Sequence, residues 1–205
     1  MAKEFFEQRR PHQGLTYEAY LEQLKRAAEA EEQAGNGNGK PGYLQLNLQR
    51  SQRVEKTYEV SEPLRTLLQA IEEPQLWMVL TEPWCGDSAQ NLPYIAKIAA
   101  CNPNIDLRIL LRDENLDIME HYLTDGKRGI PKLVAFDREG HELFQWGPRP
   151  KPAMDLFLRN RKAGLSKPAI MEKLHLWYAR DRGQTLEEEF VELLQKHVVR
   201  SKTAA

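Results

Sequence analysis

Residues 84–88, Trp-Cys-Gly-Asp-Ser, contain the side chains of this chain whose types and spacing best suit a chemical reaction. A thiolate is the reacting species in thiol–disulfide exchange, and Cys85 supplies the thiol. An apolar run at 77–80 precedes it, and helical spacing follows it. A cysteine at such a strand–helix junction meets unpaired backbone N–H groups and the positive end of the helix macrodipole. We therefore predict a reactive Cys85, with a pKa lowered from ~8.5 toward 7 or below.

Two neighbours modify this prediction. Asp87 suits the first turn of a helix, but its charge ~5 Å from the sulfur opposes the thiolate by roughly 3 kcal/mol at an effective dielectric near 20. The Asp87 carboxylate is also a candidate for passing a proton to or from Cys85. Ser88 and the backbone amides of residues 86–88 are candidates for holding the thiolate by hydrogen bonds.

The second cysteine of the chain is Cys101. Sixteen residues of helix, at ~1.5 Å each, would separate it from Cys85 by ~24 Å. A disulfide needs Cα atoms within ~7 Å, so we predict that the two cysteines do not pair. An external thiol such as glutathione would then have to release any mixed disulfide, because Ser88 cannot. The alternative for Cys85 is a buried, inert thiol, which is the usual state of a free cysteine.

The bulk composition excludes several classes of protein. Among 205 residues, 29 Lys+Arg balance 30 Asp+Glu, which gives no reason to expect a nucleic acid or an anionic membrane surface as a partner. The first residues lack the apolar run of a secretory signal, and no stretch approaches the ~20 apolar residues of a membrane span. The five histidines are scattered without metal-ligand spacing. We expect a soluble cytoplasmic protein without a metal or another cofactor.

The spacing of apolar residues predicts the elements that position the site. A helix is expected over 16–33, with Thr16 as its cap. A second helix begins at Ser61 and ends before Pro74, and a third covers 86–100. A fourth helix begins at Asp113 or Asn115. Residues 43–48 are expected to be extended. Strands are expected over 77–80, 105–111, 131–136 and 141–146.

The order of these elements indicates an α/β fold. A strand–helix–strand unit implies a parallel pair, and the last two strands form an antiparallel hairpin across a short turn. Everything after Pro148 reads as helix, with residues 185–188 as a capping box. The Gly- and Asn-rich stretch 35–42 reads as an exposed loop. A nucleotide-binding loop is a weaker alternative, because such a loop follows a strand and precedes a helix.

Residues 84–88 resemble the Trp-Cys-Gly-x-Cys site of the thioredoxin superfamily, with serine in place of the second cysteine. Pro93 stands where thioredoxins carry the proline that kinks the active-site helix. Residues 128–136 resemble the segment with the cis-proline opposite the active cysteine. The similarity covers about residues 55–160. It implies a thioredoxin-like fold, in which helices flank a central mixed sheet. Residues 1–54 would then form an N-terminal helical extension with a Gly-rich loop, and residues 161–205 a C-terminal helical extension packed on the core.

The resemblance also implies roles for individual residues. A cis peptide bond between Ile130 and Pro131 would face Cys85, and the backbone of Ile130 would pair with an extended substrate segment. Trp84 and Gly86 would border the same substrate-binding surface.

Two departures from the family pattern bear on function. Val79 stands where thioredoxins have a buried acid, and Ser88 stands where they have the second cysteine. The site more closely resembles a bacterial thioredoxin-like group in which a cysteine follows Trp-Cys-Gly-Asp. Our hypothesis is a thiol–disulfide oxidoreductase that acts through Cys85 on protein or small-molecule disulfides. The alternatives are a redox-inactive binding module, a Cys-to-Ser trapped form of a dithiol disulfide reductase, and a peroxidase-like role for Cys85.

Overall fold

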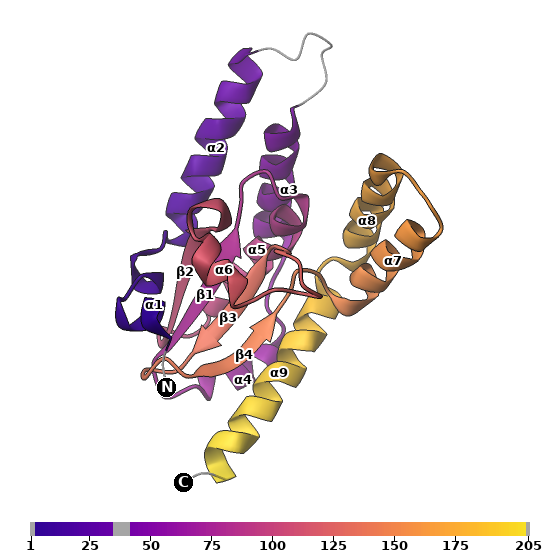
Figure 1. Ribbon diagram of the computed structural model, residues 1–205. Helices are drawn as coiled ribbons and strands as arrows, with labels where there is room; N and C mark the ends of the chain where they lie inside the picture. Colours follow the sequence, from indigo (N-terminus) through magenta and orange to yellow (C-terminus); the bar gives the residue numbers. More distant parts are fainter. Residues whose placement is uncertain (1–2, 35–41, 204–205) are drawn as a thin grey trace.

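The computed structural model describes residues 3–34 and 42–203, with side chains up to residue 196. Four strands form one sheet in the order β2-β1-β3-β4 (Figure 1). Their bounds are Gln75–Thr81 for β1, Ile105–Leu111 for β2, Lys132–Phe136 for β3 and Glu142–Trp146 for β4. Strand β1 is parallel to β2 and antiparallel to β3, and β3 pairs antiparallel with β4. The predicted parallel pair, hairpin and α/β class are confirmed.

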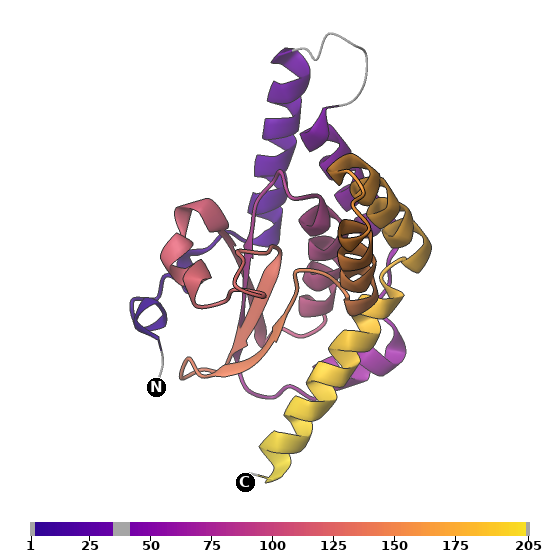
Figure 2. The same cartoon turned by 45° about the vertical axis from the view of Figure 1, so that its right-hand side comes forward.

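Helices surround this sheet and extend beyond it. Figure 2 shows α2 and α3 side by side, and α7 and α8 as a second pair. The α-helices are α1 Glu4–Glu7, α2 Tyr17–Ala34, α3 Tyr43–Thr57, α4 Glu62–Gln69, α5 Gly86–Ala99, α6 Leu116–Glu120, α7 Lys151–Lys162, α8 Lys167–Asp181 and α9 Gln184–Thr203, with short 3-10 helices at Pro11–Gln13 and Arg112–Glu114. No helix in the described part of the chain is long and apolar enough to cross a membrane.

Strand β1 forms the centre of the core and is buried along its whole length. Its side chains alternate between the two faces of the sheet. Trp77 and Val79 pack with the apolar side chains of α4, α5 and α9, and Met78 packs with those of α1 and α6 on the other face. The prediction of a strand buried on both faces is confirmed, and it explains why residues 77–80 show no polar alternation.

The predicted starts of two helices are also confirmed. The Thr16 hydroxyl accepts a hydrogen bond from the N–H of Ala19 at 3.2 Å, before α2. The Ser61 hydroxyl accepts from the N–H of Leu64 at 3.4 Å, before α4. Most of the predicted Gly-rich loop, residues 35–41, lies outside the described residues.

The extended segment predicted at 43–48 is wrong, because these residues begin helix α3. The inward face of α3 includes polar Asn47 and Ser51, which are buried, so the apolar pattern of the helix is interrupted. Its first turn is capped from outside by the carboxylate of Glu31 on α2, which accepts hydrogen bonds from the N–H groups of Tyr43, Leu44 and Gln45. A cap supplied by another helix leaves no local signal in the sequence.

The capping box predicted at 185–188 is wrong as well. Helix α9 begins at Gln184, and the N–H and hydroxyl of Thr185 bind the carboxylate of Asp181. Glu188, the acid of the predicted box, does not bind the N–H of Thr185, because that N–H is bonded to Asp181 and the Glu188 carboxylate accepts a 3.0 Å hydrogen bond from the Gln184 side chain. The turn between α8 and α9 depends instead on Gly183, with φ of +85°.

This turn gives a test of the packing between α8, α9 and the core. A Cβ at Gly183 would lie 2.3 Å from the ring of Tyr94, which is buried against Tyr58, whereas a Cβ at Gly164 (φ +76°) would meet open space. Gly183→Ala should therefore lower the free energy of unfolding by about 1–3 kcal/mol more than Gly164→Ala, which adds only the backbone cost. Urea unfolding of both variants measures the difference; equal losses would contradict the proposed packing.

Candidate functional site

The sulfur of Cys85 lies between the start of α5 and the loop that precedes β3. Cys85 is the N-cap of α5, and its Sγ accepts a hydrogen bond from the N–H of Ser88 at 3.4 Å. On the other side the thiol donates to the carbonyl oxygen of Ile130 at 3.3 Å. The peptide bond between Ile130 and Pro131 is cis. Two segments 45 residues apart in the sequence thus meet at one thiol.

Burial controls the acidity of this thiol. Cys85 is only 8% exposed, and burial together with the charge of Asp87 raises its pKa to about 11. Hydrogen bonds from Ser88 and from the Asp87 amide favour the thiolate but do not offset the burial. The predicted lowering of the Cys85 pKa toward 7 is therefore wrong. The helix start is present as expected, but its effect assumes a solvated sulfur.

Ser88 is fully buried and is held by a chain of hydroxyl groups. The Thr81 hydroxyl donates to the Ser88 oxygen at 2.5 Å, and the Tyr20 hydroxyl is hydrogen-bonded to Thr81. Because Thr81 donates to Ser88, the Ser88 proton is available to the Cys85 sulfur. Neither Thr81 nor Tyr20 was predicted as a site residue, because the sequence does not show that these two side chains meet Ser88.

Asp87 is buried in a network of its own. Arg149 binds its carboxylate with two hydrogen bonds, from Nε at 2.9 Å and from Nη2 at 2.5 Å, and the Tyr178 hydroxyl adds a third at 2.8 Å. Both carboxylate oxygens therefore accept hydrogen bonds from the C-terminal part of the chain. The charge of Asp87 raises the pKa of Arg149, against the effect of burial. Sequence reasoning missed Arg149 and Tyr178, which lie 62 and 91 residues from Asp87.

Two exposed aromatic rings flank the start of α5. Trp84 is 46% exposed and stacks under the guanidinium of Arg112, 4.9 Å from the ring centroid. Tyr43 on α3 is 45% exposed. A Cβ at Gly86 would lie 2.8 Å from the Tyr43 hydroxyl and 3.1 Å from the ring of His175 on α8, so only glycine fits these positions of the two side chains.

Helix α3 fixes the loop that carries Cys85. The Asn47 amide donates to the carbonyl oxygen of Pro83 at 2.9 Å, and the Ser51 hydroxyl donates to that of Ala89 at 3.4 Å. Arg53 donates to the side chain of Gln90 at 2.8 Å. These contacts were missed because residues 43–48 were expected to be extended and no helix was predicted over 49–57.

Cys101 lies just beyond the C-terminal end of α5, whereas Cys85 caps its start, and both cysteines are free. The Cys101 thiol donates to the carbonyl oxygen of Lys97 at 3.4 Å. The prediction that the two cysteines do not pair is confirmed. Val79, in the position of the missing acid, is fully buried among apolar side chains.

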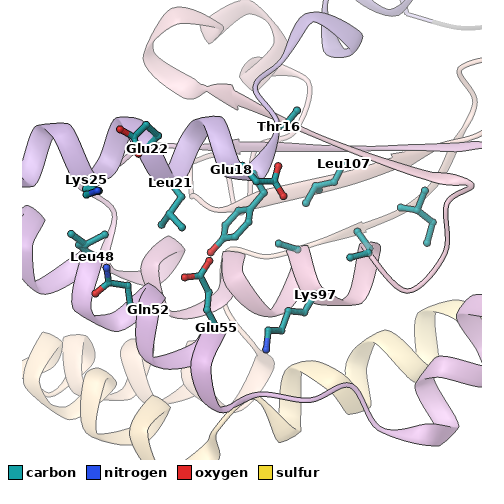
Figure 3. Close-up of a pocket in the computed structure, with 15 residues that line it drawn as sticks. Thr16, Glu18, Leu21, Glu22, Lys25, Leu48, Gln52, Glu55, Lys97 and Leu107 are labelled. Carbon is teal, nitrogen blue, oxygen red and sulfur yellow. The ribbon is translucent and has the colours of Figure 1, made fainter.

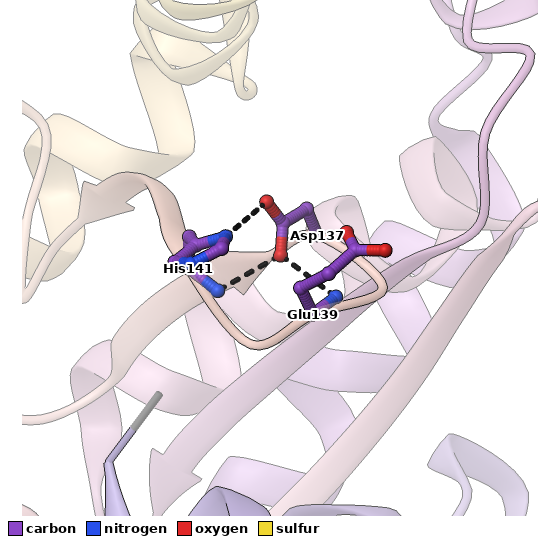
Figure 4. A group of neighbouring side chains, drawn as sticks. All are labelled: Asp137, Glu139 and His141. Carbon is purple, nitrogen blue, oxygen red and sulfur yellow. Dashed lines mark hydrogen bonds and ion pairs between the residues drawn. The ribbon is translucent and has the colours of Figure 1, made fainter. Parts of the chain in front are cut away.

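Two other features lie away from Cys85. Among the described residues, Asp137, Glu139 and His141 bring potential metal ligands together in the β3–β4 turn (Figure 4). The Asp137 carboxylate there accepts hydrogen bonds from both other residues, so the turn itself accounts for the arrangement. A pocket of about 610 Å³ lies between α2, α3 and the C-terminal end of α5 (Figure 3), with Glu18, Glu22 and Lys25 among its lining residues.

The raised pKa of Cys85 gives a direct prediction. Alkylation by iodoacetamide requires the thiolate, so its rate at Cys85 should rise about tenfold per pH unit and show no plateau below pH about 11. The measurement is the rate of Cys85 modification in Cys101→Ala protein, followed by intact mass from about pH 6 up to the highest pH at which the fold persists. A plateau near pH 7 would contradict the burial of the sulfur.

Comparison with known proteins agrees with this geometry. The sequence pattern of the family described as thioredoxin matches residues 41–164, more than half of the chain. No curated protein matches. Two solved structures are similar over 95% of this chain and 96% of theirs, each at 19% identity: a protein of unknown function from Pseudomonas aeruginosa, with a TM-score of 0.55, and an HIV epitope scaffold, with a TM-score of 0.54. At this identity they show the fold alone. With the sheet order, the strand–cysteine–helix junction and the family match together, this chain belongs to the thioredoxin family.

Proposed function

We propose that this protein is a thiol–disulfide oxidoreductase that acts through the single cysteine Cys85. The observation that carries the proposal is the position of its sulfur, at the N-cap of α5 and against the carbonyl of Ile130 beside the cis Pro131. Ser88 stands where a dithiol protein has its second cysteine, and its hydroxyl instead favours the Cys85 thiolate through a hydrogen bond.

The reaction exchanges one disulfide for another. Cys85 releases its proton to water, and the thiolate attacks one sulfur of a protein or small-molecule disulfide. A mixed disulfide forms, the substrate disulfide breaks, and the leaving thiolate takes up a proton. An external thiol, such as glutathione, attacks the mixed disulfide and restores Cys85. No electron carrier is required, because the incoming disulfide and thiol supply the redox equivalents.

The raised pKa makes the resting thiol a weak nucleophile, so substrate binding has to help ionise it. An extended substrate segment that donates a backbone N–H to the Ile130 carbonyl would displace the Cys85 thiol from that oxygen. The freed sulfur keeps the hydrogen bonds from Ser88. Trp84 and Gly86, with Pro131, would border the bound segment.

Asp87 has a different proposed role from the one first expected. Since both of its oxygens accept hydrogen bonds from Arg149 and Tyr178, we assign it the positioning of these two residues at the start of α5 rather than proton transfer. It also keeps the resting thiol protonated, because its charge raises the pKa of Cys85.

A second candidate function is a binding module that uses the same surface without turnover. The burial and raised pKa of Cys85 favour it, because a protonated, covered thiol reacts slowly. In that case the edge at Ile130 and Pro131 recruits a partner, and the sulfur is only part of the packing.

Location and domain limits complete the proposal. We place the protein in the cytoplasm, where thiols stay reduced. The division into residues 1–54, 55–160 and 161–205 stays a prediction. The hydrogen bond from Asn47 to the Pro83 carbonyl attaches the first segment to the central one, and the bond from Tyr178 to Asp87 attaches the last.

Capture of the mixed disulfide tests the reaction. Incubation of Cys101→Ala protein with excess glutathione disulfide at about pH 8.5, where an ordinary thiol is half ionised, should add one glutathionyl group at Cys85, detected by intact mass. Cys85→Ala should stay unmodified. If folded protein does not react while the same protein in urea does, the redox function is ruled out and the binding module is favoured.

Restoring a second thiol tests the trapped-form alternative. If the site is that of a dithiol reductase with its second cysteine replaced, Ser88→Cys should allow a disulfide between Cys85 and the introduced thiol under mild oxidation, with the loss of two hydrogens in the intact mass. The variant should then reduce protein disulfides in the presence of dithiothreitol faster than the parent. Two thiols that stay free under oxidation would contradict this alternative.

A further inference from the structure

Two arginines on helix α3 lie beside the cysteine site and have no acidic partner among the described residues. Arg50 and Arg53 are three residues apart, which places them on the same side of the helix. Arg50 donates to the Asn47 side chain at 2.8 Å and lies 5.9 Å from the Tyr43 ring centroid. Arg53 donates to the side chain of Gln90 at 2.8 Å. Within the part of the chain that the structure describes, neither guanidinium forms an ion pair.

Short links connect these arginines to the start of α5. Asn47, which accepts from Arg50, donates to the carbonyl of Pro83, two residues before Cys85. Gln90, which accepts from Arg53, is also hydrogen-bonded to the ring of His175 at 3.3 Å. The same ring faces the α-carbon of Gly86, next to Cys85. We call Tyr43, Arg50, Arg53 and His175 the arginine surface.

Among the described residues no ion pair neutralises this surface, and the charge of Asp87, which is itself paired with Arg149, acts on Arg50 only from beyond ion-pair distance. The other arginines near the site are paired, Arg149 with Asp87 and Arg112 with Asp113. Arg50 and Arg53 repel one another, and both oppose protonation of His175, whose pKa is lowered to about 4, mainly by burial. The Nε2 atom of His175 is buried without a hydrogen-bond partner. The surface therefore offers two guanidinium groups to an anion.

We propose that the arginine surface binds the carboxylates of a low-molecular-weight thiol or its disulfide, of the glutathione type, and presents the sulfur to Cys85. This inference rests on the proposed function and names its substrate class. Guanidinium groups recognise carboxylates through paired, charge-assisted hydrogen bonds. The exposed rings of Tyr43 and Trp84 are available for the apolar part of the ligand.

With this substrate the exchange conserves all atoms and electrons. The Cys85 thiol and one molecule of the small disulfide give the mixed disulfide and one molecule of the small thiol. One S–S bond breaks, one forms, and the proton of Cys85 ends on the released thiol.

Three disulfides of different charge test the proposal. Glutathione disulfide is anionic, bis(2-hydroxyethyl) disulfide is neutral and cystamine is cationic. The rate constant for modification of Cys85 by each is measured in Cys101→Ala protein, in the same protein with Arg50→Gln and Arg53→Gln together, and with Arg138→Gln. Arg138 is an exposed arginine of the β3–β4 turn and serves as the matched control.

The rate with glutathione disulfide, divided by the rate of the same protein with the neutral disulfide, should be about tenfold lower in the double variant than in the parent, as two partly exposed ion pairs would allow. The corresponding ratio for cystamine should be unchanged or higher, and Arg138→Gln should match the parent throughout. A double variant that keeps the parent's rate with glutathione disulfide, or slows equally with all three, overturns the inference. The neutral disulfide still reports the proposed function in those cases; if none of the three modifies the parent protein, the proposed function itself fails, and the inference with it.

Discussion

The contact between the Cys85 sulfur and the Ile130 carbonyl joins the two segments on which the site depends. It exists because β1 and β3 pair antiparallel in the middle of the sheet, so that the chain leaving β1 and the chain entering β3 meet at the same edge. Strand β1 can occupy that central place because both of its faces are apolar. The position of the thiol is therefore a consequence of the burial of one seven-residue strand.

The helices outside the central sheet complete this arrangement. Helix α3 binds the loop before Cys85 through Asn47, and the segments around Arg149 and Tyr178 bind Asp87 just after it. The pair of Arg149 and Asp87 is largely buried, and loss of one partner from such a pair costs about 3–5 kcal/mol. The start of α5 is thus held by segments that precede it and follow it in the sequence.

The sequence was sufficient for the features that depend on local pattern. The apolar run at 77–80, the strand at 105–111 and the caps at Thr16 and Ser61 follow from side-chain periodicity and from short-range hydrogen bonds. Helix α3 was missed because its buried face carries Asn47 and Ser51, which read as surface residues until α5 is placed against them. The network around Asp87 and the acidity of Cys85 depend on burial by distant segments, which periodicity does not report.

Hydrogen bonds link the hydroxyl groups of Tyr20, Thr81 and Ser88 in a chain. Each hydroxyl has a single proton, so the direction in which one of them donates constrains its neighbours. Tyr20 belongs to α2, before the segment that matches the family pattern at residue 41. The hydroxyl of Ser88, next to the sulfur, is thus linked to a helix outside the segment that matches the family pattern, and a chain shortened to that segment would keep the cysteine while losing the Tyr20 hydroxyl.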